Sequence, residues 1–401
     1  MKRRIAFGLA ATVALCLGMT ARRGPHAQTN AAPAQQPATS ARFALGGNAA
    51  EIPAEFIGDL VFLPVHVNQS QPSLFELDST AAVTSVDPSR AAELGIGIPQ
   101  APVLNLSGVD ISLDSLPQFA KKDFSAHVGR PYEGRLGNDI FAGVVIEVDY
   151  ARQGVRFYDP PAYRYAGNGT ALPLTFSGGM PVVQAKFSGA GGKMVEAGFI
   201  VNTALDASLV ISQRYAQAHR LSTSHMKTIP ATDQELGGGE GGVFGRLSEF
   251  RIGPYRIEQP IADFAKENLP AENDARIAGE IGGGMLRRFN VVFDYARQQL
   301  ILAPNGDFRF DDEEDTSGIS IIAGGPGLKE FEVTDVQPGT PAADAKIQKG
   351  DVIAAVDDEA AADLSLAAIR KLFQQVSHKY KLLIERNGKS LPLTIQTRRL
   401  L

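Results

Sequence analysis

The sequence predicts a mainly β protein in which two similar lobes precede a smaller α+β domain. From about residue 55, short β-rich runs such as "LVFLPVHV", "VVIEVDY" and "VVFDYA" alternate with Gly, Pro, Asn and Asp. The pentapeptide "DYARQ" occurs twice, at 149–153 and 294–298, and Gly137 and Gly282 keep the same spacing of 145 residues. The last segment, of about 80 residues, instead alternates strands with short helices and ends in a predicted hairpin around Asn387 and Gly388. Because self-similarity at a fixed spacing marks a duplicated unit, we expect two related lobes.

The N-terminus has the layout of a secretory signal peptide. Three basic residues at positions 2–4 precede an apolar stretch at 5–19, so residues 1–24 are the expected signal. About 15 apolar residues are few for a membrane span, and an uncleaved N-terminal anchor is the alternative and the only membrane contact expected. Residues 25–54, rich in Ala, Pro, Gln and Gly, are expected to form a disordered linker. We therefore expect a periplasmic or secreted protein.

Composition argues against several classes of function. The net charge is −5 and no long basic block occurs, so no nucleic-acid partner is expected. Cys16 is the only cysteine and lies in the apolar stretch, which rules out an internal disulfide, a cysteine nucleophile or a cysteine-ligated metal in the exported chain. The six histidines lack paired metal-ligand spacing. We therefore expect no metal and no cofactor.

Two segments carry the candidate chemistry. "FELDSTAAVTSVD" begins at Phe75, and "FIVNTALDASLVIS" begins at Phe199. Superposing them places Asp78 on Asn202, 124 residues apart, so the second copy has 21 more residues before the "DYARQ" landmark. The Gly-rich "LGGGEGGVFG" at 236–245 is a natural place for part of that insertion.

These two segments resemble the Asp-Thr-Gly-Ala segment of the retropepsin-like aspartic peptidases, which consists of a strand, a catalytic turn, a second strand and a short helix. "LGNDIFAGVVIEVDY" and "IGGGMLRRFNVVFDY" resemble the hydrophobic-hydrophobic-Gly element of the same fold. The resemblance implies two retropepsin-like β-barrel lobes, at 55–162 and 168–308. Each lobe would supply one residue of the catalytic pair.

In this family two Asp residues share one site and act together. The ionised carboxylate takes a proton from a water that attacks the peptide carbonyl, and the protonated one hydrogen-bonds the carbonyl oxygen. Asp78 retains a carboxylate, whereas the amide of Asn202 has no acidic proton to give. Since members of a catalytic unit act non-additively, the resemblance implies a degenerate pair with impaired or absent activity.

The neighbouring positions also depart from the family pattern. Thr80 and Ala204 stand where the family has Gly, and a β-branched Thr would be strained if that turn required a positive φ. Ser79 and Thr203 keep the hydroxyl that, in the family, braces one lobe against the other. Asp206 is a candidate for the missing carboxylate, but it lies beyond the turn, so a solvated loop or capping role is favoured.

The last segment, 318–400, resembles a PDZ domain through "GTPAADAKIQKGDVIAAVD". The resemblance implies a groove whose backbone N–H groups capture a peptide carboxylate, with the peptide extending a strand beside 331–336 and a helix at about 364–376 as the other wall. The alternative is a PDZ domain that docks on its own peptidase body. The expected carboxylate loop consists of Gly325, Pro326, Gly327 and Leu328.

Together these features predict an exported aspartic-peptidase-like protein that binds a peptide or protein ligand through the interlobe cleft and the PDZ groove. The Gly-rich stretch at 237–242 is expected to form a flap hairpin over the cleft or, alternatively, a simple loop. An active aspartic endopeptidase is the first alternative, working through Asp78 alone or through paired first lobes of two chains. A non-binding envelope scaffold is the second. Whether the protein is an enzyme stays open at this point.

Overall fold

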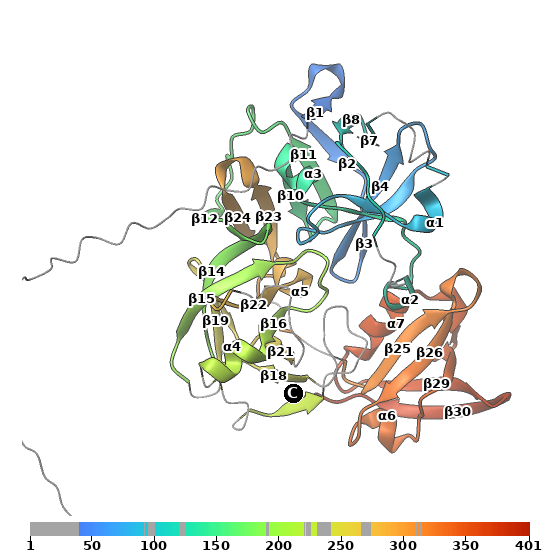
Figure 1. The fold of residues 1–401 in the computed structure, drawn as a ribbon. Helices are drawn as coiled ribbons and strands as arrows, with labels where there is room; N and C mark the ends of the chain where they lie inside the picture. Colours follow the sequence, from blue (N-terminus) through green and yellow to red (C-terminus); the bar gives the residue numbers. More distant parts are fainter. Residues whose placement is uncertain are drawn as a thin grey trace, which may run out of the picture. The chain divides into compact units, whose positions relative to one another are not determined.

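The computed structural model is mainly β (Figure 1). The expected signal peptide, most of the expected linker and most of the expected flap lie outside the residues it describes. Those residues are 40–91, 93–94, 101–119, 125–189, 192–219, 221, 226–230, 242–265, 274–309, 311–312 and 315–401.

Two strands lie within the segment expected to be a linker. β1 (Ser40–Phe43) pairs with β8 (Val109–Ser112), and β2 (Ala49–Ile52) pairs with β11 (Gly154–Tyr158). Ile52 is buried in the main core, so this segment contributes apolar side chains despite its polar composition. The linker prediction is therefore wrong from residue 40 onward.

The first lobe is built on a sheet with the strand order β1-β8-β7-β4-β5-β9-β6, with β3 paired to β4. The long strand β4 alternates buried and half-buried residues near its end, as a strand with one face in the core does. The remaining strands of this sheet are β3 (Glu55–Ile57), β4 (Leu60–Val67), β5 (Ser73–Leu77), β6 (Ser85–Val86), β7 (Val103–Leu106) and β9 (Gly134–Leu136).

The second lobe has a sheet with the order β17-β18-β21-β16-β22-β15-β14-β19-β20, with β13 paired to β14. Its central strands are buried along their whole length. Its strands are β13 (Thr175–Ser177), β14 (Met180–Ser188), β15 (Val195–Val201), β16 (Leu209–Ser212), β17 (Thr228–Pro230), β18 (Val243–Arg246), β19 (Glu249–Ile252), β20 (Tyr255–Glu258), β21 (Ile261–Ala265) and β22 (Ile277–Ile281).

A third sheet, in the order β12-β24-β23-β10-β11-β2, joins the two lobes. β10 (Val145–Asp149) and β23 (Phe289–Asp294) end at the Asp of the two "DYARQ" copies and pair antiparallel. Glu147 faces Val292, which lies 145 residues later and is its counterpart in the repeat. Counterparts that face each other across an antiparallel pair are related by an approximate local two-fold axis. The other new strands are β12 (Thr170–Pro173) and β24 (Gln299–Pro304).

Helices of the two lobes are short and sit at strand ends. Each candidate segment contains a strand, a turn, a second strand and a helix, in the expected order: α1 follows β6 and α4 follows β16. Both lobes share one continuous hydrophobic core, and the C-terminal domain has its own. The helices are α1 (Pro88–Ala91), α2 (Ser125–Val128), α3 (Asn138–Gly143), α4 (Gln213–Ala218) and α5 (Gly283–Leu286), with single 3-10 turns at Ala44–Gly46 and Tyr295–Arg297.

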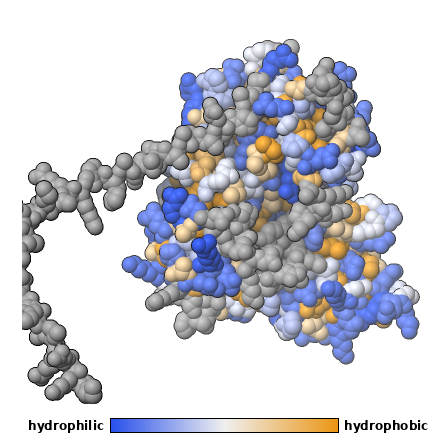
Figure 2. Space-filling view, in the orientation of Figure 1, coloured by the Kyte–Doolittle hydropathy of each residue, from blue (hydrophilic) through white to orange (hydrophobic). Residues whose placement is uncertain are grey.

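The C-terminal domain has the sheet order β25-β26-β27-β29-β30, with β28 paired to β27. The predicted hairpin around Asn387 and Gly388 is confirmed, and both have positive φ, 50° and 71°, as a type I′ turn requires. In Figure 2 hydrophilic residues cover most of the visible part of this domain. Its elements are β25 (Ile319–Gly324), β26 (Glu330–Val336), α6 (Pro341–Asp344), β27 (Val352–Val356), β28 (Glu359–Ala360), α7 (Leu366–Phe373), β29 (Lys379–Arg386) and β30 (Lys389–Gln396), with 3-10 turns at Pro326–Leu328 and Ala361–Asp363.

Candidate functional site

The two candidate turns interlock through their hydroxyl side chains. The N–H of Ser79 donates to Thr203 Oγ1 at 2.9 Å, and the N–H of Thr203 donates to Ser79 Oγ at 3.1 Å. Each hydroxyl also donates to a backbone carbonyl of the other lobe: Ser79 Oγ to Val201 at 2.7 Å, and Thr203 Oγ1 to Leu77. Both side chains are fully buried. These reciprocal bonds bring the turns that carry Asp78 and Asn202 together.

Asp78 is buried and its carboxylate is closely surrounded. Oδ1 accepts three hydrogen bonds, from the N–H of Thr80 at 2.9 Å, the hydroxyl of Thr80 at 2.7 Å and the N–H of Ala81 at 3.1 Å. Oδ2 faces Arg135, whose Nη1 lies 3.8 Å away. Oδ1 is therefore committed to the turn, and Oδ2 is the oxygen that could accept a proton from a water.

Thr80 and Ala204 fit their turns without the strain that a positive φ would cause. Neither is among the described non-glycine residues with positive φ. The Gly of the family is thus not required for this backbone conformation. Thr80 instead adds a hydroxyl donor to Asp78, and the N–H of Ala204 donates to Asn202 Oδ1 at 2.9 Å.

Asn202 is held by a carboxyl group that the sequence analysis did not single out. Its Nδ2 donates to Glu280 Oε2 at 2.7 Å. Glu280 lies on β22 beside Ile200, two residues before Asn202, and Arg135 lies on β9 beside Glu76, two residues before Asp78. Glu280 follows Arg135 by 145 residues, so the two lobes place an acidic and a basic residue at equivalent positions.

The site is consequently a cluster of buried ionisable groups. Burial, with the negative charge of Asp78 adding to it and Arg135 opposing it, raises the pKa of Glu76 to about 8. Arg135 Nε lies 3.3 Å from Glu76 Oε2. Burial also raises the pKa of Glu280, while the hydrogen bond from Asn202 lowers it and the charge of Asp78 raises it further. Burial thus shifts the protonation equilibrium of both glutamates toward the neutral form.

Sequence reasoning missed Glu76, Arg135 and Glu280, although each left a signal. Each stands in a short run of otherwise apolar or small residues, "LFELD", "GRLGN" and "GEIGG", where a charge needs a partner. Strand alternation places Glu76 on the same face as Asp78. Glu280 lies two residues before Gly282, the glycine shared by the two copies of the repeat. A charged residue within an apolar strand next to the candidate turn was the signal that the sequence offered.

Asp206 does not take part in this cluster. Its Oδ1 accepts the N–H of Asp59 from the β3–β4 turn at 2.6 Å. Burial and the charge of Asp206 raise the pKa of Asp59 to about 7, and Arg287, whose Nη1 lies 3.4 Å from Asp59 Oδ1, opposes this. The prediction that Asp206 lies beyond the catalytic turn agrees with these contacts, but it is half-buried and hydrogen-bonded rather than fully solvated.

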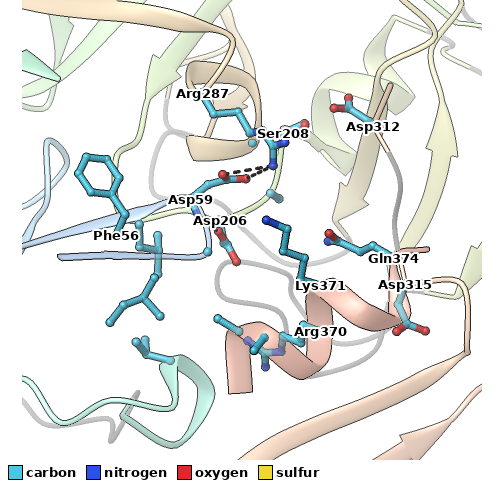
Figure 3. A pocket seen from close by; sticks show the side chains of 18 of the residues that line it. Phe56, Asp59, Asp206, Ser208, Arg287, Asp312, Asp315, Arg370, Lys371 and Gln374 are labelled. Carbon is cyan, nitrogen blue, oxygen red and sulfur yellow. Dashed lines mark hydrogen bonds and ion pairs between the residues drawn. The ribbon is translucent and has the colours of Figure 1, made fainter. Parts of the chain in front are cut away.

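Asp59 and Asp206 line a cavity of about 780 Å³ (Figure 3). Its walls come from both lobes and from the C-terminal domain, including the start of β25 and the helix α7. Figure 3 shows Lys371 extending from α7 toward Asp59 and Asp206. Neither Asp78 nor Asn202 lines this cavity. It is therefore separate from the interlocked turns.

The C-terminal groove differs in one respect from the predicted one. β26, at 330–336, is paired on both sides, to β25 and to β27, so a peptide cannot extend a strand there. That part of the prediction is wrong, because β25 is the edge strand of the sheet. α7, within the predicted helix, lies against β25. The four residues of the expected carboxylate loop form the β25–β26 turn, and none of them lines the cavity: Gly325, Pro326, Gly327 and Leu328.

The described residues contain no group of three or more His, Cys, Asp or Glu side chains placed to hold a metal ion. Within the same part of the chain, no helix has the length and apolar character needed to cross a membrane.

Comparisons with known proteins bear mainly on the C-terminal domain. The search of curated proteins gives no match. Among solved structures, the photosystem II D1 C-terminal processing protease is similar over 21% of this chain and 22% of its own, with 26% identity and a TM-score of 0.20. The match thus spans about a fifth of that protein, and with so low a TM-score it does not indicate the fold of the lobes. A protein-family model described as a PDZ domain matches residues 332–396. Residues 332–396, which include the helix α7, therefore contain a PDZ domain, the kind of domain that takes a peptide as an added strand.

Proposed function

We propose that this protein binds a peptide or protein ligand and that its two lobes are retropepsin-like with an impaired peptidase centre. The PDZ domain is the part of the proposal with independent support. The reciprocal hydrogen bonds between Ser79 and Thr203 support the proposal that the lobes are retropepsin-like, because they join a turn that carries a carboxylate to a turn that carries an amide. The joining of the turn that carries Asp78 to the turn that carries Asn202 is the observation that supports the proposal.

The chemistry of the two turns favours binding over hydrolysis. A peptidase of this type needs one carboxyl to accept a proton from water and a second to donate one to the carbonyl oxygen. Asn202 donates its amide hydrogen to Glu280 and has no acidic proton. Three donors and Arg135 occupy the surroundings of Asp78. Export to the periplasm or medium, with the N-terminal segment as signal or anchor, is part of the same proposal.

The test is a peptide-cleavage assay on the purified chain from pH 4 to 8, beside binding measurements with peptides that have free C-termini. We expect binding without cleavage by the wild type. Asn202→Asp, alone and together with Ala204→Gly, restores the second carboxyl and is the variant expected to gain peptide cleavage. Cleavage by the wild type that disappears on Asp78→Ala would contradict an impaired centre, and a lack of binding to any peptide would favour the scaffold alternative.

An active endopeptidase is a second candidate, favoured by one specific observation. Glu280 places a carboxyl group with a raised pKa 2.7 Å from the amide of Asn202. In this candidate Glu280 would supply the proton that Asn202 lacks, opposite Asp78. Glu280→Gln separates the candidates, because it would abolish cleavage here and leave peptide binding intact if the centre is impaired.

A further inference from the structure

The edge of the PDZ sheet is the surface that a peptide ligand needs. β25 is an edge strand, and α7 lies against it, so together they form the two walls of a strand-addition groove. A peptide that joins such an edge pairs with the outward N–H and C=O groups of the strand. The state of these groups therefore decides whether the groove is open.

The outward backbone groups at the start of β25 already have partners within the chain. The N–H of Ile319 is accepted by Ser317 Oγ at 3.1 Å and by Asp315 Oδ1 at 3.3 Å. The C=O of Ile321, two residues on and facing the same way, accepts Arg370 Nη2 at 3.0 Å. Proteins commonly cover an exposed sheet edge in this way to stop unwanted pairing.

Arg370 connects this edge to lobe 1. Its Nη1 donates to the C=O of His127, in α2, at 2.8 Å, while Nη2 holds Ile321. Its positive charge also acts on Asp206 of lobe 2, where it opposes the effect of burial, which raises the pKa of that carboxyl. One guanidinium of α7 thus joins the PDZ edge to lobe 1, and Figure 3 shows Arg370 and Asp206 in the lining of the same cavity.

Helix α2 lies over the same strand. It packs against β25, and Figure 1 shows it next to α7 and β25. Gly129, which follows α2, has a φ of +74°, and a Cβ there would lie 2.6 Å from Leu366 Cβ at the start of α7. The fit between lobe 1 and α7 is therefore tight enough to exclude a single methyl group.

We propose that α2 and Arg370 form a latch that closes the PDZ groove in cis, so that a peptide must displace both to pair with β25. The latch rests on the proposed peptide binding and adds its regulation. A ligand that binds only an open minority of molecules has its apparent affinity reduced by the open fraction. Displacement of α2 would also separate lobe 1 from α7, which are opposite walls of the cavity that holds Asp59 and Asp206.

Two variants test the latch from opposite sides. Gly129→Ala places a methyl group between α2 and Leu366 and replaces no residue of β25 or α7, and Arg370→Ala removes the donor from Ile321. Gly46→Ala is the matched control, because Gly46 also has a positive φ, +67°, but has no atom within 4 Å of the added Cβ. The probe is a set of fluorescent decapeptides with random sequences and free C-terminal carboxylates, measured by anisotropy on the full chain.

We expect both latch variants to bind the peptide set at least about tenfold more tightly than the wild type, and the control to match the wild type. Equal affinity for Gly129→Ala and wild type would overturn the latch while leaving the proposed peptide binding in place. Weaker binding by Arg370→Ala would show that this side chain belongs to the ligand site. No binding by any of the four proteins would overturn the proposed function and the latch with it.

Hydrogen exchange provides a second readout on the wild type. The N–H groups of Gly129 and Arg130 both donate to the C=O of Ser125, at 2.7 and 3.2 Å, and so report on α2. Saturating peptide should accelerate their exchange if the helix is displaced. Unchanged exchange with bound peptide would contradict displacement. Circular dichroism of Gly129→Ala checks that its fold is retained.

Discussion

Replacing Glu76 with Gln should change how the stability of the lobes depends on pH. Glu76 is 3% exposed, and its pKa is raised to about 8 from the ordinary 4.5. Between these two values the folded chain keeps a proton that the unfolded chain has released. The free energy of unfolding therefore falls as pH rises from 4.5 to 8, and the contribution is fully present only below pH 4.5.

The size of the effect follows from that pKa difference. At 1.36 kcal/mol per pKa unit, ionising Glu76 in the folded chain costs on the order of 4 to 5 kcal/mol by pH 8. Gln keeps the shape and the hydrogen-bonding capacity but cannot ionise. Glu76→Gln should therefore unfold at nearly the wild-type urea concentration at pH 5 and at a clearly higher one at pH 8. The free energy of unfolding of the variant should fall less steeply with pH than that of the wild type, by up to about 1.4 kcal/mol per pH unit.

The assay is urea unfolding followed by far-ultraviolet circular dichroism at half-unit intervals from pH 5 to 8.5, since the chain has no Trp. Glu196→Gln is the matched control, because Glu196 is an exposed glutamate on β15, the strand before the Asn202 turn. An unchanged slope for Glu76→Gln would refute the reasoning. It would mean that Glu76 is already ionised in the fold, stabilised by Arg135 more strongly than burial opposes it.

Three further predictions concern the lobes. Thr203→Val removes the hydroxyl that joins the two turns and should lower the free energy of unfolding by about 2 kcal/mol, measured by urea unfolding, while keeping the side-chain shape. Gly137→Ala should cost about 3 kcal/mol or more in the same assay, because its Cβ would lie 2.4 Å from the Val83 carbonyl carbon; Gly154→Ala, with nothing within 4 Å, should be close to neutral. Asp263→Asn should stabilise the chain above pH 7 and have little effect near pH 4, since burial raises the pKa of Asp263 to about 7. A variant with the same thermal midpoint as the wild type both above pH 7 and near pH 4 would contradict this.

Much of the local structure could be predicted from the sequence. Alternating apolar residues marked the strands, and Asn387-Gly388 marked a hairpin because both residues tolerate positive φ. The linker prediction failed from residue 40, because β1 and β2 are short, contain few large apolar residues and are held by pairing with distant strands. Local composition contains no information about such partners.

The candidate site was predictable in part. Aligning the repeats selected Asp78 and Asn202 together with Ser79 and Thr203, and the structure places all four at one interlocked junction. The glutamates beside them were not selected, because their importance arises from burial and from neighbours far away in the sequence. A pKa depends on the surroundings of the folded carboxyl and not on its residue type alone.

The sequence by itself determined the repeat, the β-rich pattern of the lobes, the carboxylate and amide of the two turns and the elements of the C-terminal domain. Only the tertiary structure decided that Glu280 binds Asn202, that β25 rather than β26 is the sheet edge, and that Arg370 joins this edge to His127. The physical reason is that periodicity fixes which face of each strand is buried. Which strands become neighbours, and which edge another segment covers, is set by packing between parts of the chain more than a hundred residues apart.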